Sequence, residues 1–468
     1  MKDLVFKLSL LVSVVLYYNA PLLFDRDFCI VCLIVYAINA ILIIRNDIKN
    51  IGIFNFNLLF LFSFFVCSYV YPVFLIGRPS IIGMFIEYDL NTHDTVNRCV
   101  ALCTIAACCY AVSYVSTVRD THIMVTSDEI IDARVITQRI NFPMVLICVL
   151  MLMVLINFVR TKHEVNIEVE DAPYLFELFY LMLPLYLVCN TIYNKQKNGI
   201  GKRAFVRIFK ENKLVVLLLL LLLVMFLYIG DRFPLMTITF MVLATITYFI
   251  KKIKPIRLIS FSLIGILLMF ALRVTRGGET SLSEGGFNIF IEATQTSIKD
   301  NASVWDLLSD LVGINMELNA GMDYCDKKGS LDPIANGLVA ITAPVPFLPT
   351  MITSNLYGKM PRDIVASAVI KNYTTPTAGN HCVIDIYMPF GVIGVIIVFC
   401  LFGLGVAKLT NGLNNNLYCK VFYIYLISIS IFIARNSLIN VYRAFILLFI
   451  IYCILTRFNR HFVDIRQS

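Results

Sequence analysis

Solid apolar blocks recur along the whole chain and alternate with short polar stretches. Each block is close to the roughly 20 residues that a helix needs to cross a bilayer. A membrane β-barrel would instead alternate polar and apolar residues, and backbone groups inside lipid must be bonded within their own segment. The pattern therefore predicts an all-α polytopic membrane protein. We expect twelve spans, at about residues 4–24, 28–44, 53–76, 99–116, 142–159, 173–193, 214–229, 235–250, 258–272, 383–407, 418–434 and 438–456.

This pattern divides the chain into three parts. Residues 1–272 hold the first nine spans, residues 273–382 form one large loop, and residues 383–468 hold the last three spans and a tail. Within the loop, segment 302–318 has apolar positions at helical spacing, with Glu317 among its polar positions. We expect it to form an amphipathic helix on the membrane surface.

A second segment of the loop, 343–349, contains three prolines. Proline has no backbone N–H and restricts the residue before it, so this segment cannot be the interior of a helix. We interpret it as an extended strap that crosses the mouth of a cavity.

Composition and charge support the membrane assignment. Of 468 residues, 59% are hydrophobic and 15% are charged, against about 25% charged in a soluble domain. This excludes a soluble globular enzyme and a disordered protein. The net charge of +8 implies no nucleic-acid partner, because the Lys and Arg residues lie in short loops between apolar blocks. With the N-terminus inside, the inner segments hold 23 Lys or Arg and the short outer loops hold 8. The positive-inside rule therefore predicts that both termini are cytoplasmic and that the large loop is outside.

Most of the 14 cysteines lie inside apolar blocks, where a thiol behaves as a small apolar side chain. Cys325 and Cys382 lie in the large loop. In an oxidising compartment they could form a disulfide, or both could be free thiols, and the sequence leaves the two alternatives open.

Several arginines lie at the outer ends of the expected spans. Arg232 is at the tip of a hairpin, Arg276 follows the ninth span, and Arg435 lies in the last turn. Buried arginine is costly in a membrane, so their position at one interface indicates a polar cavity. Guanidinium groups bind phosphate oxygens in pairs, which suits a diphosphate. The alternative is that each arginine only snorkels to the interface, and we favour this for Arg273 and Arg443.

His381 and Asp385 lie one helical turn apart at the start of the tenth span. They are candidate catalytic residues, because a histidine or a carboxylate can take a proton from a hydroxyl group. The simpler alternatives are a histidine that only belongs to the loop and an aspartate that pairs with an arginine. The five histidines are scattered, and no metal-binding constellation appears in the sequence.

Three short motifs resemble those of a known family. Residues 375–381 and 385–394, which include Phe390-Gly391, resemble the segment where Wzy-type O-antigen polymerases re-enter the membrane. The tip 230–232 is similar to their Gly-x-Arg turn, and residues 433–437 are similar to their late arginine-containing turn. The strap departs from the pattern, since members often carry a basic residue there.

The resemblance implies a reaction at the outer face of the bacterial inner membrane. A growing glycan leaves undecaprenyl diphosphate and joins the non-reducing end of a new lipid-linked repeat unit. It also implies the fold of a lipid-dependent glycosyltransferase (GT-C-like), with no cofactor, no metal and a separate chain-length regulator as partner. In this scheme Arg232, Arg276 and Arg435 bind the diphosphate, and His381 or Asp385 serves as base or orienter. Whether the enzyme inverts or retains the sugar configuration stays open.

Two other functions are compatible with parts of the sequence. An O-antigen ligase, which passes the glycan to the lipid A core, shares the donor and the large loop, and His381 favours it. A flippase or transporter of lipid-linked glycans would show internal repeats and charges along a path through the membrane, and the sequence shows neither.

Overall fold

The computed structural model describes residues 2–76, 93–119, 125–161, 173–198, 212–229, 231–251, 312–373 and 380–457, and every regular element in these ranges is a helix. Eight of the described helices are long and apolar enough to cross a membrane. The prediction of an all-α polytopic membrane protein is thereby confirmed. The eight candidate spans are Arg26–Asn50, Phe56–Leu75, Thr95–Thr117, Ser127–Asn157, Tyr174–Lys195, Phe233–Ile250, Cys382–Gly412 and Leu438–Thr456.

Three shorter apolar helices coincide with three further predicted spans. They are Leu4–Tyr18, Lys213–Ile229 and Leu417–Ile433. The remaining predicted span, 258–272, lies outside the described residues. The total of twelve spans therefore stays a prediction.

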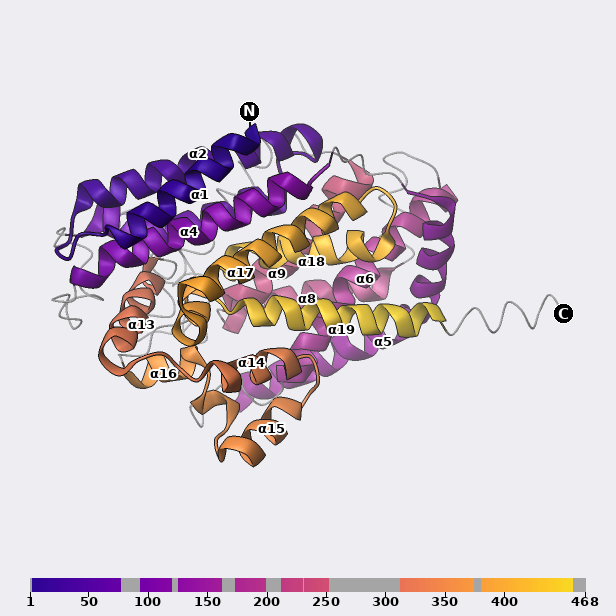
Figure 1. Cartoon of the computed structure of the whole chain (residues 1–468). Coiled ribbons are helices and arrows are strands. Elements are labelled where there is room, and N and C mark those ends of the chain that lie inside the picture. The colour runs from indigo at the N-terminus through magenta and orange to yellow at the C-terminus, as the bar shows by residue number, and fades with distance from the viewer. Residues whose placement is uncertain are drawn as a thin grey trace, which may run out of the picture. The chain divides into compact units, whose positions relative to one another are not determined.

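The chain forms two compact units. Unit 1 comprises Met1–Thr121, Val304–Asn411 and Ser430–Ile446, and unit 2 comprises the remainder. In unit 1, α1, α2 and α4 pack side by side (Figure 1). The described elements that lie in unit 1 are α1 (Lys2–Tyr18), α2 (Arg26–Asn50), α3 (Phe56–Phe65), η1 (Val66–Leu75), α4 (His93–Thr117), α13 (Ile314–Lys328), α14 (Pro333–Thr342), α15 (Leu348–Tyr357), η5 (Pro361–Asp363), α16 (Ala366–Tyr373) and α17 (Cys382–Gly412).

Two of these helices, α4 and α17, run in the same direction. Near their C-terminal ends, the Asn411 side chain donates to the carbonyl of Thr117 at 2.9 Å and accepts from the backbone N–H of Arg119 at 2.8 Å. At the other end, the start of α4 binds α13 through Arg98. Helices four and ten of the predicted topology also run in the same direction, so the order of the expected spans agrees with the packing of unit 1.

The segment η1 is a π-helix, whose wider turn leaves backbone carbonyls open to other partners. The Asn315 side chain on α13 donates to the carbonyls of Cys67 and Ser68, both at 3.2 Å. The Arg26 side chain donates to the carbonyl of Val73 at 2.7 Å. The large loop and the membrane helices of unit 1 are thus joined through the main chain of η1.

Helix α17 is broken near its start. Gly391 has φ 62° and ψ −162° inside the helix, a conformation that a residue with a Cβ rarely adopts. The break follows Pro389, and the carbonyl of Met388 accepts a hydrogen bond from the N–H of Leu331 at 2.9 Å. A short first segment of α17, residues 382–390, is therefore set apart from the long span that follows.

The large loop is more helical than the sequence predicted. The interpretation of 343–349 as an extended strap is wrong, because these residues form a tight turn between α14 and α15. The N–H of Val345 donates to the carbonyl of Thr342 at 2.9 Å, and Phe347 has φ 66°. Pro349 lies in the first turn of α15, where a missing N–H costs no hydrogen bond.

The surface helix expected at 302–318 is also different where it is described. Residues 302–311 lie outside the described residues, and α13 begins at Ile314 and continues to Lys328. Its first residues are buried on all sides, and Glu317 is only 2% exposed. Helical periodicity predicted the helix, but the polar face on which it placed Glu317 packs inside unit 1.

Unit 2 is a second group of packed apolar helices. Helix α5 packs against α6 and α8, and α9 packs against α6 and α8. Residues of α18 and α19 belong partly to each unit. The remaining described elements are α5 (Ser127–Thr161), α6 (Pro173–Asn198), α8 (Lys213–Ile229), α9 (Arg232–Thr245), η4 (Ile246–Ile250), α18 (Leu417–Ile433) and α19 (Leu438–Arg457).

Unit 2 also contains a buried ion pair. Lys420 on α18 is 0% exposed, and its ammonium group lies 2.5 and 2.6 Å from the two carboxylate oxygens of Glu129 on α5. Glu129 also accepts from the N–H of Thr126 at 2.8 Å. Each charge is therefore neutralised by the other inside the unit.

Candidate active site

Two segments that carry sequence-predicted site residues meet in unit 1. They are the start of α17 and the turn between α18 and α19. The N–H of Asn380 donates to the carbonyl of Arg435 at 3.3 Å, and the N–H of Cys382 donates to the carbonyl of Ala434 at 3.1 Å. Because both bonds are made by the main chain, they fix the position of the first turn of α17 relative to the arginine-containing turn.

Asp385 lies at the centre of this junction and is buried. Its Oδ1 accepts from the Asn380 amide at 3.0 Å, and its Oδ2 accepts from the Ser437 hydroxyl at 2.5 Å. Both partners are neutral. Hydrogen bonds to neutral donors orient a carboxylate without cancelling its charge, so Asp385 can still attract a cation or a proton.

His381 is 0% exposed and engaged on both ring nitrogens. Its Nδ1 accepts from the N–H of Val383 at 3.2 Å, and its Nε2 lies 3.1 Å from the hydroxyl of Ser68 on η1. The accepting Nδ1 requires the proton to be on Nε2, which then donates to Ser68. Burial lowers the pKa of His381 to about 3, so the ring stays neutral at physiological pH. These contacts hold the start of α17 against η1.

Glu317, which the sequence did not single out for chemistry, belongs to the same region. Burial raises the pKa of Glu317 to about 8, and the charges of Lys371 and Arg435 oppose this shift. Helix α13 comes close to the start of α17 here, because a Cβ at Gly321 would collide with the Ile384 side chain. Unit 1 thus gathers two carboxylates and two cations from four segments of the chain.

Buried acceptors complete this part of unit 1. The side-chain oxygens of Asn380 and Asn319 are buried and have no hydrogen-bond partner among the described residues. A buried acceptor that lacks a partner costs free energy, and such groups are found where a ligand or water can satisfy them. Both oxygens are suited to accept from hydroxyl groups.

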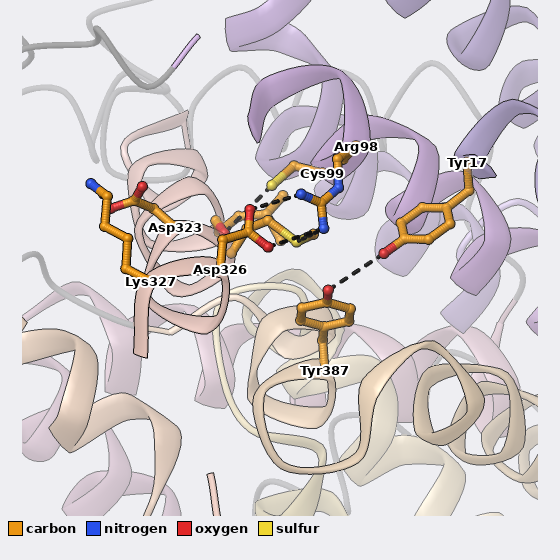
Figure 2. A network of polar contacts seen from close by, with 9 residues as sticks. Tyr17, Arg98, Cys99, Asp323, Asp326, Lys327 and Tyr387 are labelled. Carbon is orange, nitrogen blue, oxygen red and sulfur yellow. Dashed lines mark hydrogen bonds and ion pairs between the residues drawn. The ribbon is translucent and has the colours of Figure 1, made fainter. Parts of the chain in front are cut away.

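Helix α13 is anchored by a bidentate ion pair, which Figure 2 shows. The Arg98 guanidinium on α4 donates to the two carboxylate oxygens of Asp326 at 2.7 and 3.2 Å. Beside it, the hydroxyls of Tyr17 on α1 and Tyr387 on α17 lie 3.4 Å apart. The planar fork of arginine fixes both distance and angle, so α13 is held in place against α4.

Neither of the other two predicted arginines belongs to the described part of unit 1. Arg232 is the first residue of α9 in unit 2, where Asp231 caps the helix by accepting from the N–H of Phe233 at 3.2 Å. Asp231 is thus the N-cap of α9. Arg276 lies outside the described residues. The predicted gathering of Arg232, Arg276 and Arg435 stays a prediction.

The described residues contain neither a disulfide nor a metal-binding cluster. Cys325 and Cys382 are both free, which selects one of the two alternatives that the sequence left open. Within the described residues, no group of three or more His, Cys, Asp or Glu side chains could hold a metal ion.

Sequence reasoning named His381, Asp385 and Arg435, which lie in the two segments that meet here, and did not name Glu317, Lys371 and Asn380 as site residues. Helical spacing placed Glu317 on a polar face, as for any charged residue of an amphipathic helix. One signal could have identified it: Asn315, Glu317 and Asn319 give α13 a run of polar residues that a helix lying on a membrane does not need.

The model of the family described as O-antigen polysaccharide polymerase Wzy matches residues 3–461, which is nearly the whole chain. No curated protein and no solved structure matches the chain.

Proposed function

The chain belongs to the O-antigen polysaccharide polymerase Wzy family, and from this premise we propose how it acts on its substrates. The resemblance inferred from short motifs is thereby confirmed. The family and the apolar helices make the chain a multi-pass inner-membrane enzyme that polymerises O-antigen from lipid-linked repeat units.

Our proposal is that the donor is a growing glycan on undecaprenyl diphosphate and the acceptor is a single lipid-linked repeat unit. The transfer takes place at the periplasmic face, with both termini in the cytoplasm. The topology argument supports this orientation, because 23 Lys or Arg lie in the inner segments and 8 in the short outer loops.

The observation that carries the proposal is the junction of Asp385 with the Arg435 turn. Some 50 residues separate the two segments in the chain, and hydrogen bonds from Asn380, Cys382 and Ser437 join them. The same two segments carry the family motifs. A carboxylate with neutral partners therefore lies against the turn that carries Arg435, in a part of unit 1 that also holds buried acceptors for hydroxyl groups.

In the proposed reaction, a hydroxyl oxygen of the acceptor sugar bonds to the anomeric carbon of the donor glycan. The bond between that carbon and the diphosphate oxygen breaks, and undecaprenyl diphosphate leaves with the electron pair. Asp385 takes the hydroxyl proton as general base. Arg435 stabilises the charge that develops on the diphosphate, and preorganised donors of this kind contribute most where water is scarce.

The remaining sequence-predicted residues keep defined roles in this scheme. Arg232 and Arg276 stay predicted ligands of the diphosphate. His381 was a candidate base, and its burial and low pKa favour a role as a positioning residue that holds the first turn of α17. Glu317 is a further ionisable group in this region, and the charge of Arg435 lowers its pKa against the effect of burial.

The decisive experiment is deletion of the gene, followed by electrophoresis of the surface lipopolysaccharide. We expect lipopolysaccharide with one repeat unit and none longer, restored to a full ladder by the wild-type gene. Loss of every repeat would instead indicate an O-antigen ligase. Glycan trapped on the inner leaflet would indicate a flippase.

A further inference from the structure

Outside the candidate active site, two tyrosine rings form a pair on the large loop. Tyr324 on α13 and Tyr373 on α16 are 49 residues apart in the chain, and their ring centroids lie 5.4 Å apart at an interplanar angle of 89°. Both residues are half-buried. An edge-to-face contact of this kind is a preferred geometry for aromatic pairs and fixes the two rings nearly at right angles.

The pair is held by charged neighbours. The Tyr373 hydroxyl donates to Asp323 Oδ2 at 2.6 Å, and Lys327 contacts the same oxygen at 2.9 Å. The bond to Asp323, a buried residue, raises the pKa of Tyr373 and keeps its hydroxyl protonated. Tyr373 is therefore fixed in place by an ionic hydrogen bond rather than by ring packing alone.

An exposed lysine lies over both rings, so the faces that it covers are on the solvent side. The ammonium of Lys328, an exposed residue, lies 5.9 Å from the Tyr324 centroid and 5.7 Å from the Tyr373 centroid. The Lys327 side chain is 61% exposed. Two aromatic rings with the ammonium groups of Lys327 and Lys328 beside them combine an apolar platform with polar groups, as in sites that bind amphipathic ligands.

The position of the pair relates it to the candidate active site. Tyr324 lies seven residues after Glu317 on α13, which is about two helical turns further on and on nearly the same face. Along these turns the helix passes from buried residues, up to Asp323, to exposed ones from Asp326. Tyr373 likewise follows Lys371 on α16. The pair therefore lies where α13 leaves the enclosed part of unit 1 and becomes exposed.

The geometry points to a glycan-binding subsite formed by Tyr324 and Tyr373, which holds sugar residues of the lipid-linked glycan away from the reacting bond. A sugar ring is amphipathic: one face presents C–H groups that pack on an aromatic face, and its hydroxyls accept from the ammonium groups of Lys327 and Lys328. This inference rests on the proposed function. Its consequence is that the enzyme retains the glycan between additions, so the subsite sets how many repeats are added before release.

The test uses the full-length protein in nanodiscs and, as probe, the O-polysaccharide of the same strain released from its lipid by mild acid. Tyr324→Ala and Tyr373→Ala should each weaken probe binding about tenfold, since truncation of a well-placed aromatic residue commonly costs that much. In cells, the same variants should shift the ladder to shorter chains. The controls are Tyr324→Phe, which keeps the ring, and Tyr357→Ala, which removes a half-buried tyrosine of α15 in the same loop.

The outcomes separate the subsite from the reaction. Products of two repeats should still form in both alanine variants, because the reacting groups are intact. Unchanged probe binding and unchanged ladders in both variants would overturn the subsite and leave the proposed function intact. A wild-type protein that never joins two repeats would overturn the proposed function itself. If the variants fail to accumulate, hydrogen exchange on the wild type decides: the probe should protect segments 323–328 and 371–373, and unaltered exchange there contradicts the proposal.

Discussion

The two units each bury a carboxylate, and the partners of the two groups differ. In unit 2, Glu129 receives the ammonium of Lys420 on both oxygens, at 2.5 and 2.6 Å. In unit 1, Asp385 receives the amide of Asn380 and the hydroxyl of Ser437. A cation neutralises the carboxylate it binds, whereas neutral donors orient it and leave its charge in place. The first arrangement is suited to structure and the second to proton transfer, and the difference could not be inferred from residue type.

Asp385→Asn should have the largest effect, because it removes the proposed base and keeps the shape of the side chain. The initial rate of two-repeat formation in membranes supplied with lipid-linked repeat unit should fall about 10²- to 10⁴-fold. The matched control is Glu129→Gln combined with Lys420→Met in unit 2, which removes a buried carboxylate without leaving a charge unpaired and should leave that rate within about twofold of wild type at equal protein abundance. Equal rates for wild type and Asp385→Asn would remove Asp385 from the mechanism.

Arg435→Ala should follow, with a loss of about 10²- to 10³-fold in the same assay, as expected when one donor to a developing negative charge is removed. Arg232→Ala should lose chain extension in the same way if the predicted gathering of arginines is correct. Arg443→Ala, on α19, should be tolerated. A normal ladder from Arg435→Ala would contradict the proposed diphosphate site, and a normal ladder from Arg232→Ala alone would remove Arg232 from it.

Lys420→Met tests the ion pair of unit 2. It leaves the Glu129 carboxylate buried without its cation, which should cost about 3–5 kcal/mol in the free energy of unfolding and reduce membrane abundance. The double variant Lys420→Met with Glu129→Gln should recover most of that loss, because Gln keeps the hydrogen bond to the N–H of Thr126 without a charge. Thermal unfolding in nanodiscs measures both. A single variant as stable as wild type would show that the pair contributes nothing to the fold.

Glu317→Gln should have the smallest effect, and a characteristic dependence on pH. The pKa of Glu317 is about 8 in the folded chain and near 4.5 when unfolded. The unfolded state therefore releases this proton first, so stability declines as pH rises from about 4.5 to about 8. The variant should abolish this part of the decline and melt a few degrees higher than wild type at pH 8, with little difference at pH 4.5. An identical pH dependence in both proteins would show that Glu317 is not the group responsible.

The sequence predicted the membrane helices well because their signal is local. Eleven of the twelve expected spans coincide with apolar helices in the described ranges, and the segment 258–272 lies outside them. An apolar block long enough to cross a bilayer has one low-energy conformation, whatever its neighbours do. The candidate residues His381, Asp385 and Arg435 were found for a related reason, since polar groups next to such blocks are costly.

The sequence-based predictions were wrong where tertiary contacts determine the local structure. Segment 343–349 is a turn rather than a strap, because its prolines fit the start of α15 as well as they fit an extended chain. Glu317 appeared to face water because helical periodicity describes only one side of the helix as buried, whereas α13 is enclosed by other elements along its first ten residues. Neither the partners of Asp385 nor the two faces of α13 can be derived from spacing.

The first segment of α17 is attached to the rest of unit 1 by backbone groups. Its N–H groups bind carbonyls of the Arg435 turn, its Met388 carbonyl binds the N–H of Leu331, and Gly391 separates it from the span. Backbone amides are present whatever side chain a residue carries, and only proline lacks the donor. Most replacements in and around this segment can therefore accumulate over evolution without moving the aspartate. An enzyme built in this way can retain its geometry while its sequence diverges beyond recognition by pairwise comparison.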